Sequence, residues 1–167
     1  MLLSVSADPL ADYFEKLYVE QSSDVLRKLD DKRLDFLLTQ VEYIDIFVLN
    51  DDLSGDTDRR FFLELERVYT GYNTRKRLRG EEKDDATNLL RLLFRPGDDT
   101  SIDSFNPAVG LRLFSRQHVL LMEASASKGP SSATKGRIGD ALFSIDGIVP
   151  KHVDALIRLA KVEPQTK

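Results

Sequence analysis

The chain has 167 residues, of which 41% are hydrophobic and 31% are charged, and it contains two histidines and no cysteine. This length suits one domain with a sizeable core, and the composition differs from that of disordered chains. The missing cysteines exclude disulfides, thiolate catalysis and cysteine-bound metals. Residues 1–11 lack the basic start and long apolar run of a secretory signal, and no apolar run approaches membrane-spanning length, so we expect a cytoplasmic protein without a membrane partner.

The formal net charge is −4, but the two parts of the chain differ. Residues 1–74 hold 16 acidic and 8 basic side chains, a net charge of −8, whereas residues 75–167 hold 12 and 16, a net charge of +4. Such asymmetry can orient a partner of complementary charge, although +4 is mild for a nucleic-acid-binding region.

Hydrophobic spacing in the first half of the chain indicates helices. Asp8-Pro9 is a typical helix start and predicts a helix over residues 9–21. The apolar positions between Leu26 and Val48 roughly follow a period of 3.6 residues and predict one long helix, or two helices separated near Asp30-Asp31. Residues 44–49 also fit a short buried strand, but the continuous stripe favours helix.

After a turn-forming stretch at residues 50–58, Thr57 can cap a helix that carries Phe61, Phe62 and Tyr69. Farther along, the apolar residues of 86–94 predict a helix that ends before Pro96-Gly97. Residues 111–122 fit either one helix or two strands joined around residues 115–118. Residues 138–145 and 153–160 each predict one more helix.

These patterns predict an all-α fold, a single compact domain of about five or six helices, with α+β as the alternative if residues 111–122 form a β-hairpin. The Gly/Ser/Pro-rich residues 128–136 resemble a flexible loop. We therefore expect a helical core over residues 1–127, this loop, and a C-terminal helical unit over residues 137–167 that packs on the same domain.

One local pattern resembles a catalytic signature. In the HEPN ribonucleases, which are small helical domains, an arginine is followed by a histidine after four to six residues, and Arg112 and His118 have this relation. The resemblance implies a metal-independent ribonuclease, in which the imidazole transfers a proton and the guanidinium stabilises charge on the scissile phosphate. The alternative interpretation is a surface histidine beside basic side chains.

The densest basic segment, residues 75–79, contains Arg75, Lys76, Arg77 and Arg79 and follows two tyrosines. Basic and aromatic side chains together can bind nucleic acid. Four acidic residues follow between positions 81 and 85, and on a continuing helix they would pair with the basic residues at i,i+4 spacing. The alternative is thus a solvated, self-paired segment.

Other motifs do not support a cofactor or metal site. The acidic stretch that begins at Asn50 resembles a calcium loop, but its twelfth position is Phe61 instead of the glutamate that completes the ion's shell. Residues 128–136 lack the Gly-Lys-Ser/Thr of a phosphate-binding loop. We expect no cofactor and no bound metal.

The leading prediction is therefore a non-catalytic protein-protein interaction module, a small subunit or adaptor of a larger complex, with protein partners or further copies of itself. Its predicted interface uses Phe61, Phe62, Tyr69 and Tyr72, because the apolar clusters at residues 61–62 and 119–122 exceed what a small core can bury. The ribonuclease and a nucleic-acid-binding accessory protein are the alternatives.

Overall fold

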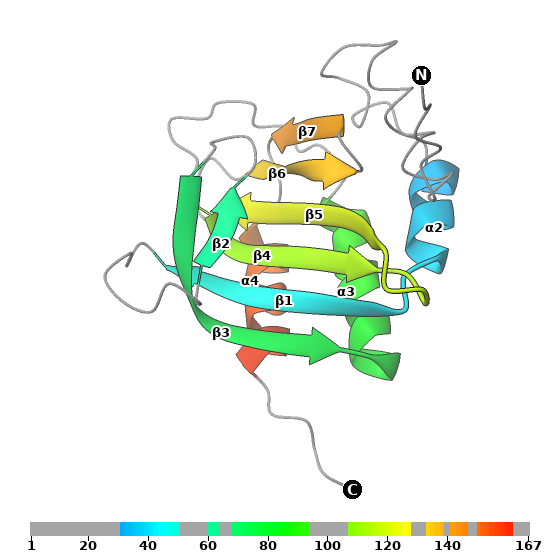
Figure 1. Cartoon of the computed structure of the whole chain (residues 1–167), viewed down its shortest axis with the longest axis horizontal. Coiled ribbons are helices and arrows are strands. Elements are labelled where there is room, and N and C mark those ends of the chain that lie inside the picture. The colour runs from blue at the N-terminus through cyan, green and yellow to red at the C-terminus, as the bar shows by residue number, and fades with distance from the viewer. Residues whose placement is uncertain are drawn as a thin grey trace, which may run out of the picture.

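The computed structural model describes residues 31–50, 60–63, 68–93, 107–127, 133–138, 141–146 and 150–161. Within these ranges, seven strands form one antiparallel sheet in the order β2-β3-β1-β4-β5-β6-β7. Helices α3 and α4 pack together against one face of the sheet, and α2 contacts α3 (Figure 1). The elements are α2 (Asp31–Thr39), β1 (Tyr43–Asn50), β2 (Arg60–Leu63), β3 (Val68–Leu78), α3 (Gly80–Leu93), β4 (Pro107–Phe114), β5 (Leu120–Ser127), β6 (Ala133–Ile138), β7 (Ala141–Asp146) and α4 (Pro150–Lys161).

The predicted all-α fold is wrong, and β1 shows the physical reason. Its side chains are buried on both faces of the sheet, since Ile44 and Ile46 face the helices while Asp45 and Phe47 face the opposite side. A strand buried on both faces lacks the usual polar-apolar alternation. Its apolar run therefore fitted the helical period, and the helix favoured for residues 44–49 is a strand.

Three more segments depart from the predicted helices. The helix capped by Thr57 is replaced by β2 and the first part of β3, and the helix over residues 138–145 by the end of β6 and most of β7. Residues 111–122, whose sequence fits either a helix or two strands, belong to the β4–β5 hairpin. The helices predicted from residues 86–94 and 153–160 coincide with α3 and α4.

The predicted loop and C-terminal helical unit also differ from the structure. Residues 133–136 of the predicted loop form part of β6, and β7 precedes α4 in the predicted helical unit. Helix α4 packs on β1, β3, β4 and β5, so it covers the same sheet as α3. The predicted helix over residues 9–21 and residues 128–132 of the loop lie outside the described residues.

The helix-covered face of the sheet holds an aliphatic core. Ile46 of β1 lies opposite Leu111 of β4, which lies opposite Ala124 of β5, and all three are buried. Burying one large aliphatic side chain stabilises a fold by about 1.5–3 kcal/mol. The helices fill this core with Ala86, Leu90, Leu93, Val153, Leu156 and Ala160.

The opposite face, here called the open face, is partly covered by β2. The pairing of β3 with β1 shifts register between Val48 and Leu49, and β3 then bends so that β2 lies in front of the sheet (Figure 1). Phe61 of β2 packs over Gly110 of β4, where a Cβ atom would lie 2.8 Å from the phenyl ring. Gly110 thus makes room for Phe61, and β2 is fixed over one end of the open face.

Candidate functional site

A row of alternating charges crosses the open face. The register aligns Arg77 of β3, Asp45 of β1, Arg112 of β4, Glu123 of β5 and Arg137 of β6 as successive cross-strand neighbours. With strands about 4.8 Å apart, this charged row is about 19 Å wide. Opposite charges on facing strand positions attract one another, so the row itself helps to hold the five strands in register.

Asp45 is the most strongly bound carboxylate of the charged row. Arg77 donates from Nε to Oδ1 at 2.7 Å and from Nη2 to Oδ2 at 2.9 Å, and Arg75 donates to Oδ2 at 3.1 Å. Burial acts to raise the pKa of Asp45, but these hydrogen bonds and the two positive charges outweigh it and hold the pKa below its ordinary value. The same contact with Asp45 raises the pKa of Arg77. Asp45 is therefore a fixed anion beneath two guanidinium groups.

Glu123 has the same role on the other side of Arg112. Arg112 Nε lies 2.6 Å from Glu123 Oε2, and Arg137 Nε lies 3.8 Å from Oε1. Only 8% of the Glu123 side chain and 3% of the Asp45 side chain are exposed, whereas Arg75 and Arg77 are 52% and 44% exposed. Solvent at the open face therefore meets guanidinium groups, and the carboxylates lie below them.

Aromatic rings contact these guanidinium groups. The Arg112 Cζ atom lies 5.1 Å from the centre of the Phe47 ring and 4.9 Å from that of Phe61. The Arg75 Cζ atom lies 5.5 Å from the Phe47 ring centre. Cation–π contacts of this kind hold a flexible arginine in one orientation, so the cationic layer is preorganised.

Several cationic side chains share the open face. Strand alternation places Lys135 on the same side as Arg137, and the Arg79 guanidinium lies over the open-face ring of Tyr43 at 4.6 Å. On β1 and β3, Arg75 and Arg77 share the single carboxylate of Asp45. The cations that the register and the ring contacts place on this face are Arg75, Arg77, Arg79, Arg112, Lys135 and Arg137.

The structure divides the predicted basic segment between the two faces. Arg75, Arg77 and Arg79 reach the open face, whereas Lys76 binds Glu82 at 2.7 Å and the Leu159 carbonyl at 3.3 Å on the helix side. The segment is a strand, so the expected i,i+4 helical pairing with the acidic residues after it does not form. The carboxylate that binds Arg75 and Arg77 comes from β1, about 30 positions earlier.

Arg112 and His118, the predicted ribonuclease pair, bind different partners. Arg112 lies in β4 and donates a hydrogen bond to Glu123. His118 lies in the β4–β5 turn, where the Tyr43 Oη atom is 3.0 Å from its Nδ1 atom. The sheet also differs from the helical domain that the HEPN resemblance implied. Catalysis by this pair remains a prediction.

The predicted aromatic interface is largely internal where the structure describes it. Phe61 is buried, and Tyr72 packs edge-on against Phe47 with ring centres 5.0 Å apart. Phe62 and Tyr69 face each other in the β2–β3 register, and their side chains lie outside the described part. Of the apolar residues 119–122, Leu121 and Met122 are buried in the sheet and Val119 is exposed.

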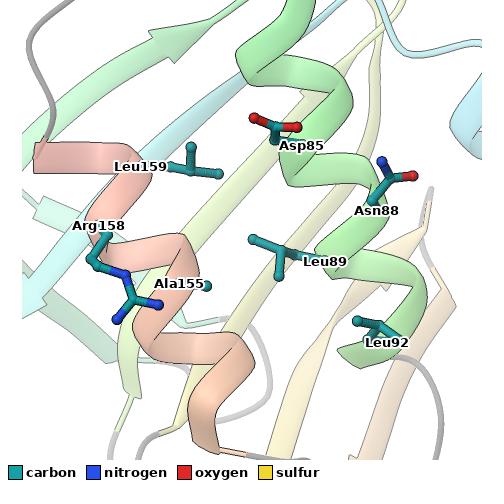
Figure 2. Close-up of a pocket in the computed structure, with 7 residues that line it drawn as sticks. All are labelled: Asp85, Asn88, Leu89, Leu92, Ala155, Arg158 and Leu159. Atoms are coloured by element: carbon teal, nitrogen blue, oxygen red, sulfur yellow. The ribbon is translucent and has the colours of Figure 1, made fainter.

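A shallow groove lies on the other side of the molecule, between α3 and α4. Figure 2 shows Leu89 and Leu92 facing Ala155 and Leu159 across it, with Asp85, Asn88 and Arg158 at its borders. The groove has a volume of about 420 Å³, and Leu92 is 38% exposed. It is mainly apolar and presents one charge of each sign, so the two sides of the molecule offer different surfaces.

The described ranges show neither a metal cluster nor a membrane-spanning helix. No cluster of three histidine, aspartate or glutamate side chains in them could hold a metal ion. No helix in them is long and apolar enough to cross a membrane. Comparison of the chain with protein-family models, with curated proteins and with solved structures returned no match.

Proposed function

We propose that this protein is a non-catalytic binding protein whose open face binds single-stranded nucleic acid. The observation that carries the proposal is the layering of this face, with the exposed Arg75 and Arg77 above the buried Asp45 and the partly exposed Arg112 and Arg137 beside the buried Glu123. On β1 and β3, Arg75 and Arg77 share the single carboxylate of Asp45, and the Arg79 guanidinium lies over the Tyr43 ring, so this part of the open face offers positive charge to a polyanionic ligand. Arginines and lysines that neutralise phosphates supply most of the affinity in sequence-independent binding.

The shape of the open face favours a single strand over a duplex. Its guanidinium groups lie on aromatic rings, and such planes stack on unpaired bases. Bases of a duplex already stack on one another and present only their edges in the grooves. A sheet with cationic and aromatic side chains thus suits a strand whose bases are free.

Fluorescence anisotropy with a labelled, mixed-sequence single strand tests the proposal. We expect binding at low ionic strength that weakens as salt rises, with a slope of about −0.7 for each phosphate contact in a plot of log affinity against log salt. Absence of binding at roughly 50 mM salt would overturn the proposal. Tighter binding to anionic lipid vesicles or to polyglutamate than to the oligonucleotide would also overturn it.

A pair of charge reversals separates the open face from the overall charge. Arg79→Glu on the open face is expected to weaken binding about tenfold and to lower the salt slope. Arg158→Glu, an equal charge change at the α3–α4 groove, is expected to leave affinity within about twofold. Equal losses in both variants would show that net charge alone drives binding, contrary to the proposal.

A protein-protein interaction module is the second candidate, favoured by the apolar groove between α3 and α4 (Figure 2). The occupant that fits it is an amphipathic helix of a partner protein, with a cation near Asp85 and an anion near Arg158. Partners captured by the wild-type chain should be lost with Leu92→Asp and kept with Arg79→Glu. Capture unaffected by Leu92→Asp would exclude this groove.

A further inference from the structure

One end of the open face carries an aromatic cluster next to the charged row. Tyr43, at the start of β1, stacks on Phe114 of β4 with ring centres 4.9 Å apart and planes 16° apart. The Arg77 and Arg79 guanidinium groups lie 4.2 Å and 4.6 Å from the centre of the same tyrosine ring. We call Tyr43, Phe114 and His118, together with these two arginines, the aromatic end.

His118 holds an unusual position at the aromatic end. Its φ angle is +63°, in the left-handed region where most side chains are strained and glycine is favoured. Its backbone N–H donates to the Ser115 carbonyl at 3.0 Å, which closes the turn. A glycine would meet this backbone requirement without strain, so the turn itself does not need an imidazole ring.

The imidazole of His118 is nevertheless held in place. The Tyr43 hydroxyl lies 3.0 Å from Nδ1, and the two ring centres are 5.7 Å apart at an angle of 52°. His118 is exposed, whereas Tyr43 is buried beneath it. The result is a flat ring on an exposed residue that is fixed by a buried neighbour, and this neighbour also stacks on the partly exposed Phe114.

From this geometry we propose that the aromatic end is the subsite for an unpaired nucleobase, which stacks on His118 and Phe114. Arg77 and Arg79 hold the phosphate next to that base. The inference rests on the proposed function and deepens it, because it assigns the base to His118 and Phe114 and the adjoining phosphate to Arg77 and Arg79. Stacking fits every base, so the subsite requires a base but selects no sequence.

Two oligonucleotides separate stacking from phosphate binding. One is a single strand with 2-aminopurine among uniform pyrimidines, and the other has the same phosphates but abasic sites. The wild-type protein is expected to quench 2-aminopurine fluorescence and to bind the base-containing strand at least fivefold more tightly than the abasic strand. Equal affinity without quenching would overturn this inference and leave the proposed function standing, whereas no binding of either strand would overturn both.

His118→Gly is the decisive variant, because glycine accepts the positive φ and folding is preserved. It is expected to lower the preference for base over abasic strand at least threefold and to reduce quenching, while affinity for the abasic strand and the melting temperature are kept. Gln117→Gly, an exposed neighbour in the same turn, is the matched control and should change neither. If His118→Gly kept the full preference for the base-containing strand over the abasic strand, or if Gln117→Gly lost as much of it, a stacking role for the histidine would be contradicted.

Discussion

On the helix-covered face of the sheet, cross-strand neighbours are aliphatic, whereas on the open face the next register positions carry opposite charges. Ile46, Leu111 and Ala124 form one such aliphatic row, and Asp45, Arg112 and Glu123 form the charged row one position away. The aliphatic row gains stability by leaving water. The arginines of the charged row remain at least partly exposed to solvent, so a ligand can replace the solvent there. The same three strands thus provide a core on one face and a binding surface on the other.

The largest expected effect lies in the core. Leu111→Ala removes a fully buried side chain between β1, β5 and the helices, and should lower the free energy of unfolding by about 3 kcal/mol. Urea denaturation measures this change. Leu92→Ala, at an exposed position of α3, is the matched control and should lose less than about 1 kcal/mol. If Leu111→Ala also weakened oligonucleotide binding in its folded state, the two faces would not be independent.

The next effect concerns the buried carboxylate of the charged row. Asp45→Asn leaves Arg75 and Arg77 without their anion and should cost about 2 kcal/mol at pH 7, as measured by urea denaturation. Asp84→Asn is the matched control, because its carboxylate is 66% exposed beside Lys83, and should cost less than about 0.5 kcal/mol. Equal losses would show that burial does not strengthen the Asp45 pairs.

The lowered pKa of Asp45 makes the stability that its ion pairs contribute depend on pH. A carboxylate with a folded-state pKa below the ordinary 3.8 contributes stability that is fully present above that value and is lost as the pH falls through the folded-state pKa. Asparagine does not titrate, so the stability difference between wild type and Asp45→Asn should narrow below pH 3.8. A difference that stayed constant down to pH 2 would contradict the assigned ion pairs.

The sequence predicted the two helices that cover the core but not the sheet. In α3 and α4 one side meets the core and the other meets water, so the helical period is visible in the sequence. In β1 both faces are buried, and in β3 the residues of both faces between positions 74 and 77 are polar. Neither strand shows the period of two that identifies a half-buried strand.

The candidate site was visible only in part for a related reason. The sequence shows residues 75–79 as a basic run, but the Lys76 side chain lies on the helix side of the sheet. Arg112, Lys135 and Arg137 reach the same face as Arg75 and Arg77 only through the register of the sheet. The anions Asp45 and Glu123 lie far away in sequence. Local spacing could therefore predict a basic segment, whereas the gathering of cations from β3, β4 and β6 on one face depends on the pairing of distant strands.

The smallest effect concerns the contact that ties β2 to the open face. In Gly110→Ala the new methyl group would lie 2.8 Å from the Phe61 ring, so the ring must shift, at a cost of about 1 kcal/mol in urea denaturation. Because Phe61 also packs on Phe47 and contacts the Arg112 guanidinium, the shift should loosen the Arg112 side of the open face and weaken oligonucleotide binding about twofold. Phe61→Leu should relieve the clash, so the double variant should lose less stability than the sum of the single variants. Strictly additive losses would show that Gly110 and Phe61 do not meet, and that β2 is not held over the sheet by this contact.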